Sequence, residues 1–177
     1  MFRYISLLLF VGLAWGQNEY NIKHIVDQDS VYKKKFSDEI VNGNIYQMTD
    51  DMKIPLGKMK NGKKDGLWTE WYPNKRKLEE TYRHGMLDGS VSLYYKTGQK
   101  EWRHTYNNGQ LEGLWTYWYE NGQKMREGNF MCGDSTGKWI WWDKNGRVEK
   151  EKKFKNRKNA IWENYNEYVL IEVVTEP

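Results

Sequence analysis

The side chains that most often carry chemistry in proteins are few in this chain and irregularly placed. The histidines are His24, His84 and His104, and Cys132 is the single cysteine. Zinc sites need pairs such as His-x-x-x-His or Cys-x-x-Cys, and neither occurs. We therefore expect no metal site and no cofactor, and Cys132 is interpreted as a turn residue.

Carboxylates recur with a regular spacing that could resemble a catalytic pair. They are Glu79, Glu101, Glu127 and Glu149, each shortly after a predicted turn. Two facing carboxylates can hydrolyse a glycosidic bond, but repeated positions in a sheet more often pair with nearby Lys or Arg across strands. No G-x-S-x-G, phosphate-binding loop or dinucleotide motif is present. The sequence predicts a protein that is not an enzyme.

A period of 23 to 24 residues organises the chain around these side chains. Four equivalent glycines follow one another at steps of 23, 24 and 24 residues: Gly66, Gly89, Gly113 and Gly137. Weaker copies begin near Gly43 and Ala160, so we expect about six units. A period of this length is typical of repeat architectures, in which each unit is stabilised by its neighbours.

Within a unit, the residues after the glycine alternate as a β-strand requires, because successive side chains point to opposite faces. One predicted row is rich in aromatic residues and includes Trp68, Tyr72, Tyr95, Trp115, Tyr117, Tyr119, Trp139 and Trp141. The opposite face carries one aromatic residue per unit: Trp71, Tyr94, Trp118 and Trp142. We expect the richer row to be the core on a concave face and the sparser row to be the candidate interaction surface.

Turn signals separate the two strands of each unit. They are Thr-Gly at 97–98 and Asn-Gly at 121–122 and 145–146, and both residues of an Asn-Gly turn can take positive φ. In the first strong unit Lys75 replaces the glycine and the next segment is one residue shorter. We expect that hairpin to be the most irregular.

A G-x-x-x-G pattern returns the chain to each new hairpin. Its members are Gly62 and Gly66, Gly85 and Gly89, Gly109 and Gly113, and Gly133 and Gly137. The residues between them are polar, which excludes a transmembrane dimerisation motif. We expect these glycines to supply positive φ and to leave room for a neighbouring aromatic ring against bare backbone.

These patterns predict an all-β fold: a single-layer meandering antiparallel sheet of tandem β-hairpin repeats. We expect a signal peptide at 1–16, a polar leader at 17–35, the repeat array at 36–168 with its strong units at 59–155, and a C-terminal strand or tail at 169–177. Residues 168–174 would close the far edge.

The first residues predict export. Arg3 precedes an apolar stretch from Tyr4 to Leu13, and Ala14 and Gly16 fit a cleavage site. We expect a mature start near Gln17 and a periplasmic or extracellular location. The net charge is only +4, with Lys and Arg interspersed among acidic residues. We expect no nucleic-acid partner, and the basic run from Arg147 to Lys158 is interpreted as a solvated edge hairpin.

The repeated phrase resembles the MORN repeat, and more closely its bacterial variant in which W-Y-x-N-G closes the unit. The matching segments begin at Gly62, Gly85, Gly109 and Gly133, and the resemblance covers 57–155. It implies the hairpin-repeat fold and a non-catalytic role as a scaffold or interaction module. Lipid binding is often proposed for the family, and some bacterial members are assigned as antitoxins.

The leading hypothesis is an exported, non-catalytic binding scaffold that contacts a protein partner in the cell envelope or outside the cell. Binding of a cell-wall glycan or a choline-type ligand through the aromatic rows is one alternative, because stacked rings suit sugars and quaternary ammonium groups. An antitoxin-like neutraliser of a partner protein is another. A membrane-surface lipid is a further candidate partner. The sequence leaves the oligomeric state open.

Overall fold

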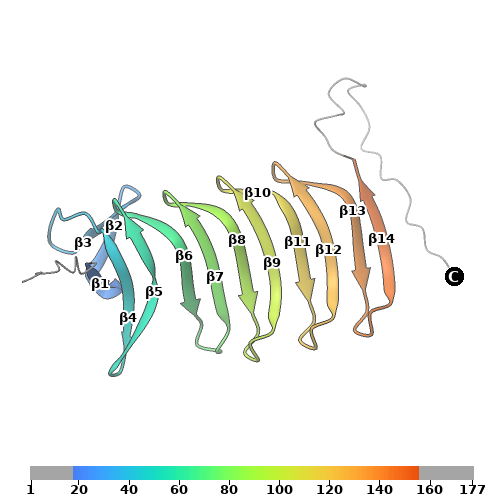
Figure 1. The fold of residues 1–177 in the computed structure, drawn as a ribbon, viewed down its shortest axis with the longest axis horizontal. Coiled ribbons are helices and arrows are strands. Elements are labelled where there is room, and N and C mark those ends of the chain that lie inside the picture. The colour runs from blue at the N-terminus through green and yellow to red at the C-terminus, as the bar shows by residue number, and fades with distance from the viewer. Residues whose placement is uncertain (1–17, 156–177) are drawn as a thin grey trace, which may run out of the picture.

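The computed structural model describes residues 18–155, which form a ribbon of β-hairpins in a single layer (Figure 1). This confirms the predicted fold class. The main sheet runs β1-β4-β5-β6-β7-β8-β9-β11-β12-β13-β14, with β10 beside β9, and β2 and β3 pair separately. The five described units are the hairpins β4–β5, β6–β7, β8–β9, β11–β12 and β13–β14. The elements are β1 Glu19–Asn21, η1 Ile22–His24, β2 Ile25–Gln28, β3 Val31–Lys34, β4 Gly43–Thr49, β5 Met52–Lys60, β6 Lys63–Trp71, β7 Lys77–Arg83, β8 Met86–Tyr94, β9 Lys100–Asn107, β10 Gln110–Leu111, β11 Gly113–Trp118, β12 Lys124–Met131, β13 Asp134–Trp142 and β14 Val148–Phe154.

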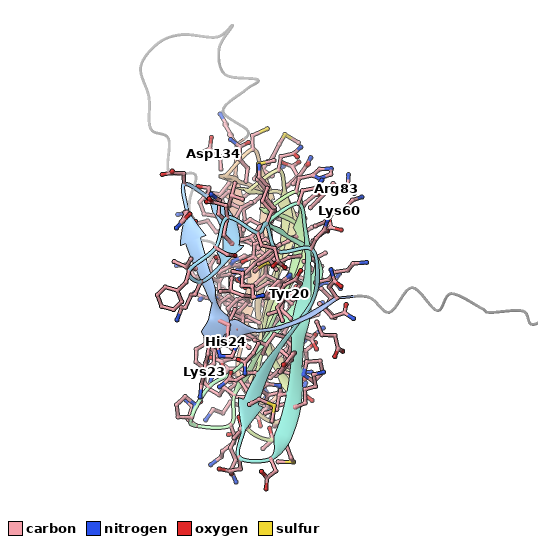
Figure 2. The ribbon with its side chains drawn as sticks, turned by 90° about the vertical axis from the view of Figure 1, so that its left-hand side faces the viewer. Tyr20, Lys23, His24, Lys60, Arg83 and Asp134 are labelled. Atoms are coloured by element: carbon pink, nitrogen blue, oxygen red, sulfur yellow. The ribbon has the colours of Figure 1, made fainter. Side chains whose placement is uncertain are left out.

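Two-residue turns join consecutive hairpins at one end of the strands. Both residues of each turn have positive φ, as type I′ turns require, and the pairs are Asn61-Gly62, His84-Gly85, Asn108-Gly109 and Cys132-Gly133. In these turns, the N–H of the glycine at the second position donates to a backbone carbonyl near the preceding turn. Gly85 N–H donates to Lys64 O and Gly133 N–H donates to Leu111 O, both at 2.9 Å. Lys60, Arg83 and Asp134, which flank these turns, lie toward the same end of the strands (Figure 2).

Three-residue loops close the four strong hairpins at the opposite end of the strands, whereas β4–β5 closes with the two residues Asp50 and Asp51. In β8–β9, Tyr95 N–H donates to Gln99 O and Gly98 N–H donates to Tyr95 O, and Gly98 alone has positive φ. The same bonds recur in the next two hairpins. Asn121 and Asn145 do not take positive φ, so the expectation that both Asn-Gly residues would do so is wrong. A three-residue loop with a left-handed final residue needs only the glycine.

The first strong hairpin, β6–β7, is the most regular of the four, which contradicts the prediction. In the other three the register shifts beside the loop, because one extra residue opposes the first strand. β6 and β7 pair from Gly66 with Tyr82 to Trp71 with Lys77 without a shift. The missing residue is the bulge residue. Lys75 occupies the glycine position with φ 64° and keeps the loop hydrogen bonds.

The N-terminal segment caps the first edge of the ribbon. β1 pairs with β4 in parallel, and β2 and β3 form a small hairpin whose Tyr32 N–H donates to Gly62 O. The segment predicted to be a polar leader thus contributes apolar residues to the main core. Figure 2 labels three residues of this segment: Tyr20, Lys23 and His24. The core cluster contains Ile25, Val41, Ile45, Met59 and Trp68, with Tyr20, Ile22, Tyr32, Leu56 and Tyr82 packed against it.

Aromatic rings do lie against bare backbone, but not at the G-x-x-x-G glycines. A Cβ added at Gly66, Gly109, Gly133 or Gly137 would meet no atom within 4 Å. The rings of Trp68 and Trp139 cover Gly57 and Gly128 instead, where an added Cβ would come within 2.6 Å and 2.1 Å of ring carbons. At these four positions the glycine serves backbone conformation, whereas a Cβ added at Gly62 or Gly89 would also come within 2.5 Å of Val31 or 3.0 Å of Thr81.

Several predictions concern residues outside the described range. They are the signal peptide at 1–16, the weak unit near Ala160, and the terminal strand at 168–174. Within residues 18–155, no helix has the length and apolar character needed to cross a membrane.

Candidate interaction surface

The four residues predicted to form an interaction surface lie at one level on one face of the ribbon. Trp71, Tyr94, Trp118 and Trp142 each end the first strand of a hairpin. Trp71 and Tyr94 both pair with Lys77, and paired residues of antiparallel strands share a face. Tyr94 also pairs with Lys100, and Trp118 pairs with Lys124.

Lysines alternate with the aromatic rings along this line. The Lys77 Nζ lies 5.9 Å from the Trp71 ring centroid and 4.3 Å from that of Tyr94. The Lys100 Nζ lies 5.7 Å and 5.8 Å from the Tyr94 and Trp118 centroids. Such distances are within the range of cation–π attraction. We call the seven residues the aromatic–lysine ladder: Trp71, Lys77, Tyr94, Lys100, Trp118, Lys124 and Trp142.

Carboxylates on the same face neutralise part of this charge. Glu79 accepts hydrogen bonds from Lys77 Nζ and Tyr94 Oη, each at 2.7 Å. Burial opposes ionisation of Glu79, but these hydrogen bonds outweigh it, so the pKa of its carboxyl lies below the usual range. Burial, together with the bond to Glu79, raises the pKa of Tyr94 to about 12. Glu127 accepts from Lys124 Nζ at 2.6 Å and from the buried Thr116.

The ladder is accessible to a partner at several points. Trp71 is 55% exposed, and the other three rings are partly exposed. The hairpin loops beside them are linked by side chains: Tyr95 Oη donates to Trp118 O, and Tyr119 Oη donates to Trp142 O, both at 2.9 Å. Because these bonds connect successive units, they fix the spacing of the rungs.

The opposite face carries a continuous aromatic cluster. Trp102 stacks on His104 at 4.2 Å between centroids, and His104 stacks on Trp115 at 5.1 Å. Arg126 covers the rings of Trp115 and Tyr117 at 4.5 Å and 4.2 Å. Burial, aided by Arg126, lowers the pKa of His104 to about 4, so this imidazole is neutral at pH 7.

This face supplies the most buried aromatic residues of the sheet. Trp68 and Trp139 are 5% and 6% exposed, and Val91 and Leu93 of the same face are also buried. Trp115 is only half-buried and contacts Trp139 at 5.1 Å between centroids. The row predicted as core is therefore the more buried one, although its central members remain partly open.

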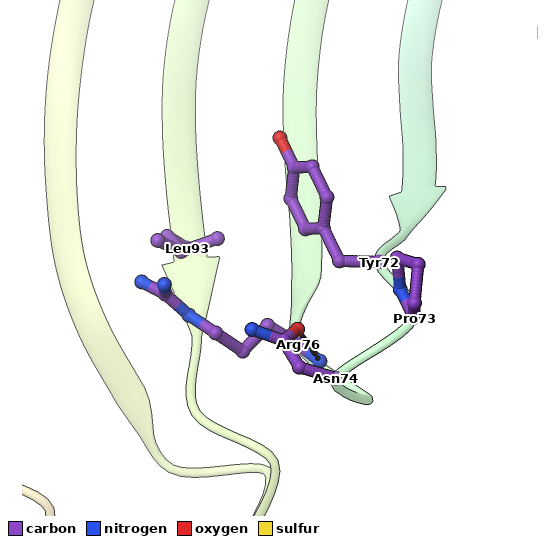
Figure 3. Close-up of a pocket in the computed structure, with 5 residues that line it drawn as sticks. All are labelled: Tyr72, Pro73, Asn74, Arg76 and Leu93. Atoms are coloured by element: carbon purple, nitrogen blue, oxygen red, sulfur yellow. Dashed lines mark hydrogen bonds between the residues drawn. The ribbon is translucent and has the colours of Figure 1, made fainter.

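A hollow of about 390 Å³ lies at the loop of β6–β7, lined by Tyr72, Pro73, Asn74, Arg76 and Leu93 (Figure 3). Arg76 extends from the loop toward Leu93 and forms an ion pair with Glu101 of the next hairpin. This ion pair connects the first and second strong units. The later units are connected by the tyrosine-to-carbonyl bonds instead.

Three of the four repeated glutamates, Glu79, Glu101 and Glu127, form ion pairs, as one of the two interpretations expected. Of these three pairs, Arg76–Glu101 links two hairpins. Lys77–Glu79 and Lys124–Glu127 each lie within a single strand, so their pairing is not cross-strand as predicted. Over residues 18–155, the structure shows no group of three or more His, Cys, Asp or Glu side chains that could hold a metal ion.

Two segments of the sequence match a known repeat family. The MORN repeat variant model matches residues 111–131 and 135–156. These MORN-variant segments correspond to the last two hairpin units, and the preceding hairpins repeat their loops and hydrogen bonds. The chain matches no curated protein. The bacterial antitoxin-type variant receives no support from these matches.

The residues that sequence reasoning missed follow a signal that was present. Lys77, Lys100 and Lys124 each open the second strand directly after a loop, at steps of 23 and 24 residues. Trp102 and His104 lie on a second strand, β9, whereas the predicted aromatic rows lie on the first strands and the residues that follow them. Neither set could be placed on a face without the bulges, because one extra residue changes which positions share a side.

Proposed function

We propose that this protein is an exported, non-catalytic binding scaffold whose aromatic–lysine ladder contacts a protein partner in the cell envelope or outside the cell. The regular line of rings and lysines on one face supports this. Partly exposed Trp and Tyr side chains are enriched at the centres of protein interfaces, and hydrogen bonds between units hold the rungs at fixed spacing.

The neighbouring residues Trp141 and Trp142 provide a matched test, because they point to opposite faces of β13. We expect Trp142→Ala to weaken retention of a partner in pull-downs from envelope and secreted fractions by at least about tenfold. Trp141→Ala should leave retention unchanged. Equal retention by both variants and wild type would remove the ladder as the contact surface.

A glycan is the second candidate ligand. Glu79 and Glu127 lie beside the rings, and carboxylates can bind sugar hydroxyls while rings stack on sugar faces. A choline-type ligand is disfavoured, because lysines already lie over the rings that would bind it. Saturable binding to purified peptidoglycan that is lost in Trp142→Ala would favour the glycan over a protein.

Export is part of the proposal and rests on the order of charged, apolar and small residues in the first 16 positions. Mass spectrometry of the protein from its native cells should find a mature start near Gln17. A cytoplasmic protein that retains Met1 would contradict export. It would also make an antitoxin-like role with a cytoplasmic partner the better proposal.

A further inference from the structure

The seam between β5 and β6 is open over most of its length. The two strands pair only where Lys58–Lys60 meets Lys63–Asp65, next to the turn. Beyond Gly66, β6 pairs with β7 on one side alone, and β5 pairs with β4. In Figure 1 the two strands diverge away from the turn that joins them. Each strand thus presents an edge without a ladder partner.

Local residues explain why this seam opens. Pro55 lies in β5 and pairs with Tyr46 of β4, but it has no N–H to donate to a strand on the β6 side. The Trp68 ring lies against Gly57, and its Nε1 donates to Lys58 O at 3.0 Å. An indole N–H therefore bonds to the β5 backbone just where the strand pairing stops.

A hollow of about 280 Å³ occupies the open seam. Four consecutive residues of β6, Trp68 to Trp71, line it. Successive side chains of a strand point to opposite faces. A hollow that is lined by all four residues must therefore lie beside the edge of β6. Tyr32 and Ile22 of the cap and Leu56 of β5 supply an apolar wall.

The charges in the hollow favour a basic guest. Lys64 Nζ lies 3.9 Å from a Glu80 carboxylate oxygen and over the rings of Trp68 and Tyr82, so these two charges compensate each other. Glu70 also lines the hollow and forms no ion pair within residues 18–155. One uncompensated negative charge therefore lies two residues from the apolar surface of Trp68.

We propose that this seam binds an extended segment of a partner protein, which adds as a strand to the free edge of β6, places an apolar side chain against Trp68 and Leu56, and places a Lys or Arg beside Glu70. Added strands gain affinity from main-chain hydrogen bonds and specificity from pockets for alternate side chains. This site deepens the proposed scaffold function and rests on it, because both require a protein partner. It is separate from Trp118 and Trp142 of the ladder.

Selection from a phage-displayed library of random twelve-residue peptides against the full chain tests the proposal. Enriched peptides should carry an apolar residue and a Lys or Arg two positions apart. Their binding should protect from hydrogen exchange those amides of residues 67–71 that point to the free edge of β6. No enrichment, or binding without this protection, would overturn the proposal.

Variants of the full chain localise the peptide. Gln47 lines the hollow and is exposed, so Gln47→Trp should fill the hollow and weaken peptide binding by at least about tenfold. Glu70→Gln should weaken it by about threefold, as loss of a rim ion pair does. The control Glu149→Gln makes the same charge change at the far end of the ribbon and should have no effect.

The same peptides separate this site from the ladder. Peptide binding that is unchanged in Gln47→Trp but lost in Trp118→Ala would overturn the seam proposal and leave the ladder as the contact surface. The opposite outcome is that seam peptides bind normally and Trp142→Ala still retains every envelope partner. That result would overturn the proposed function of the ladder without affecting the seam proposal.

Discussion

At the scale of single residues, His104 is a side chain whose protonation is coupled to folding. It lies between the rings of Trp102 and Trp115, faces the Arg126 guanidinium, and its Nε2 has no hydrogen-bond partner in the structure. Burial and that cation lower its pKa to about 4, whereas an unfolded histidine titrates near 6.5. The unfolded chain therefore binds the proton more readily.

This difference predicts a pH dependence of stability. The stabilisation from neutral His104 is fully present above about pH 6.5 and is lost as the pH falls toward 4. We expect His104→Gln to lose less free energy of unfolding than wild type between pH 7.5 and pH 5, because glutamine does not titrate. Urea unfolding at both pH values measures this, and identical losses in the two proteins would contradict it.

Glycines with two different roles should respond differently to substitution. Gly128→Ala should cost about 2–3 kcal/mol, because the new Cβ would meet the Trp139 ring, which has no space to move within a buried site. Gly133→Ala should cost only about 1 kcal/mol, because its Cβ meets no atom within 4 Å and only the positive φ opposes it. Chemical denaturation of both variants decides, and a smaller cost at Gly128 would show that the ring is not fixed there.

The two faces of β11 offer a comparison of tryptophans. Trp115 contacts His104, Tyr117, Phe130 and Trp139, so Trp115→Ala should lower the free energy of unfolding by about 3 kcal/mol. Trp118 is partly exposed and has the Lys100 Nζ 5.8 Å from its ring centroid, and Trp118→Ala should cost about 1 kcal/mol. Thermal melts of both variants test this. A larger loss for Trp118 would reverse the assignment of core and surface.

At the scale of elements, one position per hairpin decides how the loop closes. Gly98, Gly122 and Gly146 take φ near 85°, and Lys75 takes 64° in the same place. Because a side chain disfavours this conformation, we expect Lys75→Gly to stabilise the protein by about 0.5–1 kcal/mol. Lys96→Gly, at a loop position without positive φ, should instead destabilise slightly. Differential scanning calorimetry can resolve the two directions, and a destabilising Lys75→Gly would be the contrary result.

The hairpins could be predicted from the sequence because their signals are local. Alternating residues, turn glycines and a fixed period specify strands and loops without knowledge of tertiary contacts. The missing bulge beside the β6–β7 loop is visible in the sequence as a segment one residue shorter, but the prediction took this difference for irregularity. A register shift depends on which strand partners meet, and a single strand does not encode that.

The cap and the open seam were beyond local patterns. Residues 17–35 are polar overall, and Tyr20, Ile22, Ile25 and Tyr32 are too sparse to indicate a core. Ile25 becomes buried and the other three become partly buried because the cap folds back beside β4 and the first turn. Likewise, Pro55 indicates a weak strand, but its effect on the β5–β6 seam requires knowledge of which strand lies beside it.

At the scale of the whole molecule, the ribbon is a chain of nearly equivalent joints. The amide-to-carbonyl bonds at the two-residue turns recur from unit to unit, and so do the tyrosine bonds at the loops. Each hairpin therefore depends mainly on its two neighbours, as expected for a linear repeat array. The buried cluster at the capped end makes that end different from the rest.

This organisation predicts that one complete unit can be removed. Deletion of residues 90–113 joins Gly89 to Leu114, so β8 continues with the sequence of β11 and strand alternation is preserved. We expect a folded protein with the same circular dichroism per residue and a ladder shortened by one rung. A deletion of residues 90–101 removes half a unit, including most of β8. Because β8 pairs with both β7 and β9, that variant should unfold at a markedly lower temperature. If the two deletions melted at the same low temperature, the units would not be interchangeable, and the array would fold as one indivisible domain.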